Sequence, residues 1–277
     1  TAHAGIVVPS SQESLDAVIT ALGQIAAFER SLWTATTVIG VTGSSGKTST
    51  KDIIGQVLSA TGITHAPTGS LNNELGLPLT ILHTPDKADF LVAEMGMRGF
   101  GHIKYLCDIA RPRIGVVTNV GHAHIGEVGS IEGIAKAKSE LVHALPSDGV
   151  AILNADDFRV RNMATDLSCR VMLYGYSSNA DVQARDIHTN ADGTLHFSLC
   201  AFDEVEEVRL ALLGEHNISN ALAAATVGLA VGMSLKSIAQ ALSAVVPKSK
   251  WRMEVHPLEC GITLINDCLL YTSDAAD

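Results

Sequence analysis

Short apolar runs alternate with longer amphipathic stretches through the middle of this chain. Five runs rich in Val, Ile and Leu predict strands, at residues 38–42, 89–95, 113–119, 150–154 and 170–174. Apolar residues recur at helical spacing in five other stretches, at residues 47–60, 102–109, 130–145, 217–231 and 234–245. Ser130 and Ser234 stand where two of these helices begin and are typical N-cap residues. The alternation predicts an α/β fold built on a doubly wound parallel sheet.

Three regions lie outside this alternation. Residues 181–213 alternate polar and apolar positions, with turn residues at 190–193, and predict a small antiparallel sheet. Residues 5–8 are strand-like and residues 14–28 form an amphipathic helical pattern. Near the other end, residues 262–265 form one more strand-like run.

Composition narrows the class of protein. Of the 277 residues, 47% are hydrophobic and 17% charged, which favours a globular fold with a substantial core. The net charge of −10 and the lack of a basic run argue against nucleic-acid binding. The longest apolar stretch, residues 221–233, is too short to span a membrane. The sequence has five cysteines without a C-x-x-C pair and shows no signal-peptide pattern. These features predict a cytoplasmic protein with free thiols. We also expect the protein to be a monomer.

The run from Val38 to Lys51 combines a strand, a Gly-rich turn and the start of a helix. Its turn predicts a phosphate-binding loop, in which backbone N–H groups and the helix N-terminus face phosphate. Lys47 is expected to reach the phosphates of ATP or a relative, and the Thr48 hydroxyl to face Mg²⁺. Val41 departs from the usual first glycine, and a small-residue turn with a solvated lysine is the alternative. The candidate nucleotide-binding residues are Thr42, Gly43, Ser44, Ser45, Gly46, Lys47, Thr48 and Ser49.

Two strand ends carry candidate metal ligands. Glu94 closes the predicted strand 89–95, and the carboxyl ends of parallel strands face the crevice in which ligands bind. Its carboxylate is therefore a candidate Mg²⁺ ligand, with a solvated acid as the alternative. His122 and His124 follow strand 113–119 in a Gly-containing turn, and His124 is the better placed for a site. A structural histidine remains the alternative there.

One predicted helix carries two lysines on different faces. Its apolar stripe includes Ile131, Ile134 and Leu141. Lys138 falls within this stripe, whereas Lys136 lies about 200° away at about 100° per residue. An inward lysine must extend to the surface, be paired or be chemically altered. We therefore expect Lys138 to face the interior and Lys136 to face solvent.

Seven motifs resemble, in order, those of the Mur ligases of peptidoglycan synthesis. They are T-G-S-S-G-K-T at 42–48, L-N-N-E-L-G-L-P-L-T-I-L at 71–82, E-M-G-M at 94–97, N-V-G-H-A-H at 119–124, I-A-K-A-K-S-E-L at 134–141, G-E-H-N-I-S-N-A-L-A-A at 214–224, and W-R-M-E-V at 251–255 leading to I-N-D at 265–267. The N-N-x-x-G-x-P-L-T stretch is most similar to the branch that adds a dipeptide.

The resemblance implies a multidomain ligase of which this chain is a part. On that pattern, residues 1–33 are the end of a UDP-sugar-binding domain and residues 34–247 the central ATP-binding domain. Residues 248–267 would begin a C-terminal ligase domain. Residues 268–277 depart from the family pattern, and we expect them to be non-native.

The implied activity is ATP-dependent amide-bond formation between UDP-MurNAc-tripeptide and D-Ala-D-Ala. The peptide carboxylate attacks the γ-phosphate of ATP to give an acyl phosphate. The amine of D-Ala-D-Ala then displaces phosphate. Catalysis of this kind depends on positioning and on cations around the transferred phosphoryl group.

The resemblance also implies roles for individual residues. Lys47 would hold phosphate, and Thr48 and Glu94 would hold one Mg²⁺. A second Mg²⁺ would be held by Glu94, His124 and a carbamylated Lys138. The other matches are Asn217 and Asn220 near the nucleotide base, Arg252 and Asp267 at the phosphate and ribose, and Asn72 and Asn73 on the muramoyl-peptide side.

Two alternatives stay open at this point. One is another amide ligase of the same shape, such as MurE or a folylpolyglutamate synthase. The other is a nucleotide-binding module without ligase activity, which substrate-dependent phosphate release would distinguish from a ligase. We expect this chain alone to bind Mg-ATP weakly and not to ligate, because most of the residues that would orient two substrates are missing.

Overall fold

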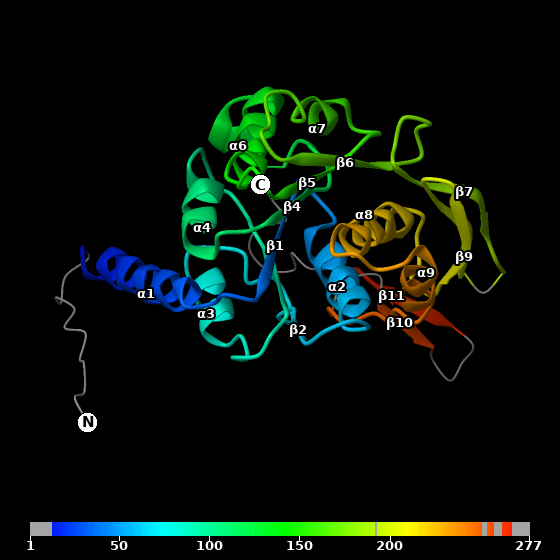
Figure 1. The fold of residues 1–277 in the computed structure, drawn as a ribbon, viewed down its shortest axis with the longest axis horizontal. Coiled ribbons are helices and arrows are strands. Elements are labelled where there is room, and N and C mark those ends of the chain that lie inside the picture. Colours follow the sequence, from blue (N-terminus) through cyan, green and yellow to red (C-terminus); the bar gives the residue numbers. More distant parts are fainter. Residues whose placement is uncertain (1–12, 124, 192, 251–253, 258–261, 268–277) are drawn as a thin grey trace.

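A single large sheet runs through the protein (Figure 1). The computed structural model describes residues 13–123, 125–191, 193–250, 254–257 and 262–267. In spatial order the strands are β2 (Thr64–His65), β3 (Phe90–Glu94), β1 (Thr37–Thr42), β4 (Ile114–Val117), β5 (Val150–Asn154), β6 (Arg170–Gly175), β7 (Val182–Thr189), β8 (Leu195–Ala201) and β9 (Glu204–Leu210). Neighbours are parallel from β2 to β7, and β8 and β9 are antiparallel.

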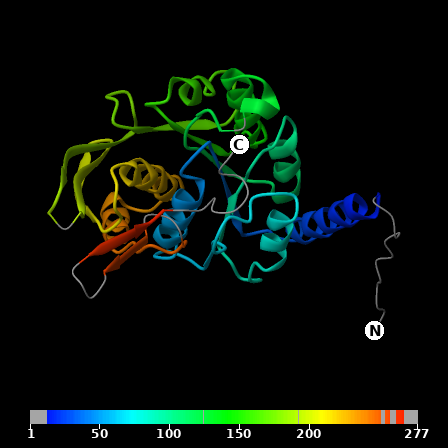
Figure 2. The same ribbon diagram turned by 180° about the vertical axis from the view of Figure 1, so that it is seen from behind.

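Helices cover both faces of this sheet, as the doubly wound prediction requires (Figures 1 and 2). One face packs against α2 (Lys47–Leu58), α8 (His216–Ala230) and α9 (Leu235–Ser243). The other packs against α1 (Glu13–Ser31), α3 (Gly76–Leu82), α4 (His102–Ala110), α6 (Ile131–His143) and α7 (Phe158–Asn162). A short helix, α5 (Ile125–Val128), precedes α6. The α/β fold class predicted from the sequence is confirmed.

Strand β1 shows why the apolar runs form buried strands. Ile39 and Val41 point into the core beneath α2 and α8, whereas Val38 points into the core on the opposite face. A strand covered on both sides is apolar at successive positions, because neither face meets water. Gly40 lets α6 approach closely, since a Cβ there would lie 2.8 Å from Leu141 Cδ1.

The predicted antiparallel strands are present, but they continue the main sheet and do not form a sheet of their own. β7 pairs in parallel with β6 through Tyr174 and Gly175, and it pairs antiparallel with β8. β7 therefore joins the two parts into one sheet. The predicted turn at 190–193 connects β7 and β8, and Asn190 N–H donates to Thr194 O over 2.9 Å.

Both predicted N-caps form. Ser130 Oγ accepts from Gly133 N–H over 3.0 Å at the start of α6, and Ser234 Oγ accepts from Ser237 N–H over 3.2 Å at the start of α9. The predicted phase of α6 is also confirmed. Lys138 is 2% exposed, whereas Lys136 is exposed.

The last described strands, β10 (Glu254–Pro257) and β11 (Thr263–Asn266), pair antiparallel as a separate two-stranded sheet (Figure 1). The strand-like run at 5–8 and the tail at 268–277 lie outside the described residues. Cys107, Cys169 and Cys200 are buried free thiols. Within the described part of the chain, no helix is both long enough and apolar enough to cross a bilayer.

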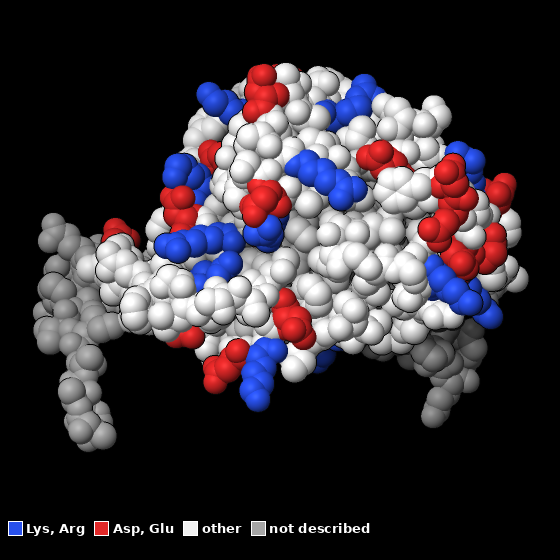
Figure 3. Space-filling view, in the orientation of Figure 1, with Lys and Arg blue, Asp and Glu red and all other residues white. Residues whose placement is uncertain are grey.

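Charged side chains are dispersed over the face shown in Figure 3, where lysines and arginines do not form a continuous patch. Acidic side chains gather instead over the sheet edge at β9, which contributes Glu204, Glu206 and Glu207.

Candidate nucleotide-binding site

The Gly-rich loop lies between β1 and α2, at the carboxyl end of a central parallel strand. β1 is flanked in the sheet by β3 and β4, so the ends of these three strands lie side by side. Glu94 ends β3, and Thr118 and Asn119 follow β4. The sheet order thus brings together motifs that are far apart in the sequence.

Two glycines give the loop its shape. Gly46 has φ of 77° and forms the N-cap of α2, in the left-handed region that glycine adopts without strain. A Cβ at Gly46 would lie 2.8 Å from Asn220 Oδ1, and a Cβ at Gly43 would lie 1.8 Å from Thr118 Oγ1. Any larger residue would therefore displace the loop from α8 or from the end of β4.

The segment after β4 supports the loop through hydrogen bonds. Ser44 N–H donates to Asn119 O over 3.0 Å, and Ser45 N–H donates to Asn119 Oδ1 over 2.9 Å. Thr118 Oγ1 donates to Ser45 O over 2.7 Å, and Gly121 N–H donates to Ser44 Oγ over 2.8 Å. From the sequence, the candidate site residues of this segment are His122 and His124. The observed contacts between the segment and the loop come instead from Thr118, Asn119 and Gly121.

Lys47 folds back over the loop. Its Nζ donates to Gly43 O over 2.8 Å, and the side chain is half-buried. Thr42, the last residue of β1 before the loop, is buried, and its Oγ1 donates to Met95 O over 2.8 Å. The ammonium therefore lies above the loop, where phosphate binds in loops of this type.

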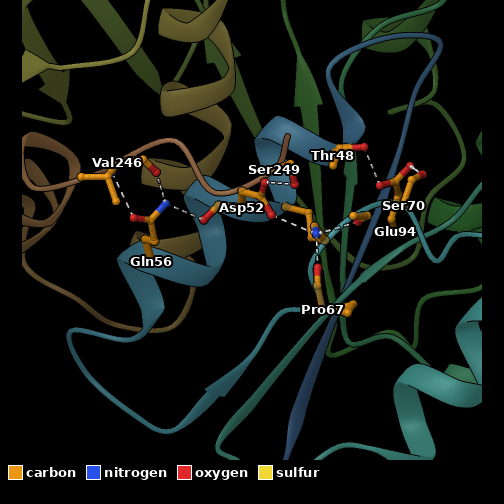
Figure 4. A network of polar contacts seen from close by, with 10 residues as sticks. Thr48, Asp52, Gln56, Pro67, Ser70, Glu94, Val246 and Ser249 are labelled. Atoms are coloured by element: carbon orange, nitrogen blue, oxygen red, sulfur yellow. Dashed lines mark hydrogen bonds and ion pairs between the residues drawn. The ribbon is translucent and has the colours of Figure 1, made fainter. Parts of the chain in front are cut away.

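Glu94 is a buried carboxylate, 2% exposed, that accepts hydrogen bonds on both oxygens (Figure 4). Thr48 Oγ1 donates to Glu94 Oε2 over 2.8 Å. Ser70 Oγ and Asn72 Nδ2 each donate to Glu94 Oε1 over 2.8 Å. The predicted pair of Thr48 and Glu94 is thus in direct contact.

A cavity of about 490 Å³ is connected to this pair through Asn72, which lines the cavity and hydrogen-bonds Glu94. Its lining includes the side chains of Lys47, Lys138, Asn72, Asn73 and Arg98. Burial, and then the nearby charge of Lys47, lowers the pKa of Lys138 to about 7. Near neutral pH this amine is therefore uncharged in a substantial fraction of molecules.

The two asparagine pairs have different surroundings. Asn72 contacts Glu94 in addition to lining the cavity, and Asn73 Oδ1 accepts from Gly76 N–H over 2.8 Å at the start of α3. Asn220 Oδ1 accepts from Thr50 Oγ1 over 3.0 Å, and Asn220 Nδ2 donates to Asn217 Oδ1 over 3.0 Å. Asn220 thus joins α8 to α2, the helix after the loop, and Asn217 accepts its other hydrogen bond.

Two predicted site residues, His124 and Arg252, lie outside the described residues. His122 is exposed, and Asp267 is exposed beyond β11. Across the ranges that the structure describes, no group of three or more His, Cys, Asp or Glu side chains could hold a metal ion. Any metal site that includes Glu94 must therefore draw on other ligand types or on His124.

Comparison with known proteins identifies related chains. Residues 41–228 match the family described as the Mur ligase middle domain. The UDP-N-acetylmuramoyl-tripeptide–D-alanyl-D-alanine ligase of Mycobacterium tuberculosis is 44% identical over 266 residues, covering 95% of this chain and 52% of the relative. The Bacillus subtilis protein of the same name is 38% identical over 254 residues, covering 91% of this chain and 54% of the relative.

Solved structures agree with this match. A crystal structure of MurF from Acinetobacter baumannii has a TM-score of 0.83 and 34% identity, covering 90% of this chain and 54% of that chain. MurF from Thermotoga maritima in complex with ADP has a TM-score of 0.80 and 28% identity, covering 90% and 57%. The chain thus spans about half the length of the relatives that it matches.

Proposed function

The chain belongs to the Mur ligase family, and we propose that it is the ATP-binding part of a ligase that joins D-Ala-D-Ala to UDP-MurNAc-tripeptide. The relatives that carry this activity in their names support the choice of substrates. The observation that carries the proposal is one cavity lined by Lys47, Lys138 and Asn72, with Asn72 hydrogen-bonded to the buried Glu94 at the end of β3.

The residues of the site fit a magnesium nucleotide. The loop holds the Lys47 ammonium beside Gly43, where it would meet phosphate at the start of α2, and Thr48 offers a hydroxyl oxygen next to a carboxylate. The three hydrogen bonds that Glu94 accepts come from neutral groups, Thr48, Ser70 and Asn72. A buried carboxylate with neutral donors favours a divalent cation nearby. Thr48 and Glu94 would hold Mg²⁺, which would neutralise charge on the phosphates.

Lys138 fits a carbamylated metal ligand. It is nearly fully buried, it lines the same cavity as Lys47, and its pKa of about 7 leaves uncharged amine available to react with CO₂. Reaction with CO₂ would turn the Lys138 amine into an anionic carbamate. The carbamate would attract the Lys47 ammonium, whereas a protonated Lys138 would repel it. We propose that Lys138, together with Glu94 and His124, holds a second Mg²⁺.

In the proposed reaction, a carboxylate oxygen of the peptide attacks the γ-phosphorus and ADP leaves. The amine of D-Ala-D-Ala then attacks the acyl carbon, the carbon–oxygen bond to phosphate breaks, and the amine loses a proton. Lys47 would stabilise charge on the γ-phosphate oxygens. The cavity beside it, with Arg98 and Asn73 in its lining, would orient the peptide carboxylate.

The test is phosphate release by the full-length protein, followed with each substrate omitted in turn. Release that requires ATP, UDP-MurNAc-tripeptide and D-Ala-D-Ala together supports the proposal. Release with a UDP-MurNAc-dipeptide and a single amino acid would favour the MurE-like alternative. Nucleotide binding without substrate-dependent release would favour a plain binding module.

A further inference from the structure

A buried ion pair on α2 has no part in the reaction described above. Lys51 is fully buried and Asp52 is 8% exposed, and Lys51 Nζ lies 2.9 Å from Asp52 Oδ1. Lys51 Nζ also donates to the backbone carbonyls of Pro67 and Gly69, the latter over 2.9 Å. Its three N–H groups thus have three acceptors. A buried charge that is satisfied in this way holds its partners in one geometry.

On one side, the pair is connected to the buried carboxylate of Glu94. Pro67 and Gly69 belong to the loop that leads to Ser70, and Ser70 Oγ donates to Glu94 Oε1 (Figure 4). Lys51 therefore fixes the backbone immediately before a residue that hydrogen-bonds Glu94.

On the other side, the pair is connected to the segment that follows α9. Ser249 Oγ donates to Asp52 Oδ2 over 2.5 Å. Gln56, one turn further along α2, donates from Nε2 to Val246 O over 3.0 Å and accepts on Oε1 from Val246 N–H over 3.1 Å. The segment 246–249 lies between α9 and β10 in the chain, and Figure 4 shows its contacts with Asp52 and Gln56 of α2.

We propose that Lys51 and Asp52 are positioning residues that couple segment 246–249 to the loop 67–70 and, through Ser70, to Glu94. Movement of the chain beyond α9 is then transmitted to the carboxylate beside the nucleotide. This inference rests on the proposed function only for the role of Glu94, because the contacts themselves are independent of the reaction.

The first experiment measures backbone hydrogen exchange in the full chain. Ser249→Ala and Gln56→Ala each remove contacts to segment 246–249 without touching the loop 67–70. We expect exchange at residues 68–72 to rise about fivefold, the factor that corresponds to losing one net hydrogen bond. Ser249→Thr, which keeps the hydroxyl, should restore protection.

Ser59→Ala is the matched control. Ser59 is on the same helix, but its Oγ donates only to Gly55 O, over 2.6 Å. Exchange at 68–72 should be unchanged in this variant. A rise confined to residues 246–249 in Ser249→Ala and Gln56→Ala would overturn the proposal, as would an equal rise at 68–72 in Ser59→Ala.

The second readout is the Mg²⁺ concentration that gives half-maximal binding of a fluorescent ADP analogue. We expect this concentration to rise about threefold or more in Ser249→Ala, since Glu94 loses part of its orientation, and to stay constant in Ser59→Ala. No change in Ser249→Ala would overturn the link to Glu94. If the wild-type chain binds no ADP, the proposed function fails, while hydrogen exchange still decides whether the two segments are coupled.

Discussion

Thr48 Oγ1 donates a hydrogen bond to Glu94 Oε2 over 2.8 Å, which joins the first turn of α2 to the last residue of β3. β1 and β3 are adjacent in the sheet, with Val41 paired to Glu94, so the loop after β1 must pass over the end of β3. A hydroxyl at the start of the loop helix therefore reaches a carboxylate that lies 46 residues away in sequence. In the proposed site, this contact would place two oxygen ligands next to one Mg²⁺.

Replacing Thr48 with Val should remove the response of nucleotide binding to Mg²⁺. The substitution keeps the shape of the side chain but deletes the oxygen. We expect ADP affinity in EDTA to change by less than about twofold, and its enhancement by Mg²⁺ to fall about tenfold, as for loss of one charge-assisted contact. Isothermal titration measures both. Thr80→Val is the control, because Thr80 is also buried and its Oγ1 donates to Gly76 O within α3.

Replacing Lys47 with Ala should weaken ADP binding about 10- to 100-fold, since hydrogen bonds to charged groups contribute about 1.5–3 kcal/mol. The lysine is half-buried above the loop, so its loss leaves phosphate charge uncompensated. Titration calorimetry at low salt gives the affinity. Lys104→Ala, at an exposed ion pair with Asp108, should leave the affinity unchanged, and equal affinities for Lys47→Ala and the wild type would rule out the assigned role.

The sequence predicted the central elements well because their signals are local. The P-loop strand and helix, and the inward phase of Lys138, follow from apolar spacing alone. The helix α3 was not predicted, because Gly76 and Pro78 in its first turn read as a turn signal. Membership of β7 in the main sheet depends on pairing with β6, which no local pattern encodes.

The positions of the candidate site residues were also predictable only in part, because only some of them carry a local sequence signal. Glu94 stands at a strand end, a position that suggests a ligand-facing role. No prediction was made for Lys51 and Asp52, because adjacent charged residues on a helix are usually exposed. Both are buried, because the loop 67–70 and the segment 246–249 cover them. Asn119 was overlooked beside two histidines, although it supports the loop through Ser44 and Ser45.

Cys107 should make the stability of the protein fall at alkaline pH. Burial, and then the charges of Asp108 and Glu140, raises the pKa of its thiol from 9.0 to about 12. Between these values the unfolded chain releases a proton that the folded chain keeps, so stability present below pH 9 is lost as the pH rises.

Urea unfolding at pH 8 and pH 10, compared between the wild type and Cys107→Ala, isolates this effect. We expect the wild type to lose about 1.4 kcal/mol more than the variant between the two pH values, one pKa unit of linkage. The variant's own loss of packing cancels in this comparison, because it is the same at both pH values. Parallel stability curves would contradict the assigned environment of Cys107.

Lys138 and Lys136 provide a matched pair for the last prediction. They are two residues apart on α6, yet Lys138 is 2% exposed in the cavity lining, whereas Lys136 is exposed with its Nζ 5.8 Å from the ring centroid of Phe100. In the full-length protein, Lys138→Ala should lower the ligation rate by about 100-fold or more, the scale of losing one preorganised electrostatic group. Lys136→Ala should change it by less than about twofold, as for other surface substitutions.

Chemical rescue then tests why Lys138 is needed. A small carboxylic acid, or added bicarbonate, can place an anion where the carbamate would lie, so it should partly restore ligation by Lys138→Ala alone. The carbamate itself should give a ¹³C NMR signal when the wild type is supplied with ¹³C-bicarbonate at pH 7.5, and this signal should be absent in Lys138→Ala and present in Lys136→Ala. Because the pKa of Lys138 is about 7, the signal should weaken as the pH falls below that value and the amine becomes protonated. An essential Lys136 with a dispensable Lys138 would contradict the argument from helical phase.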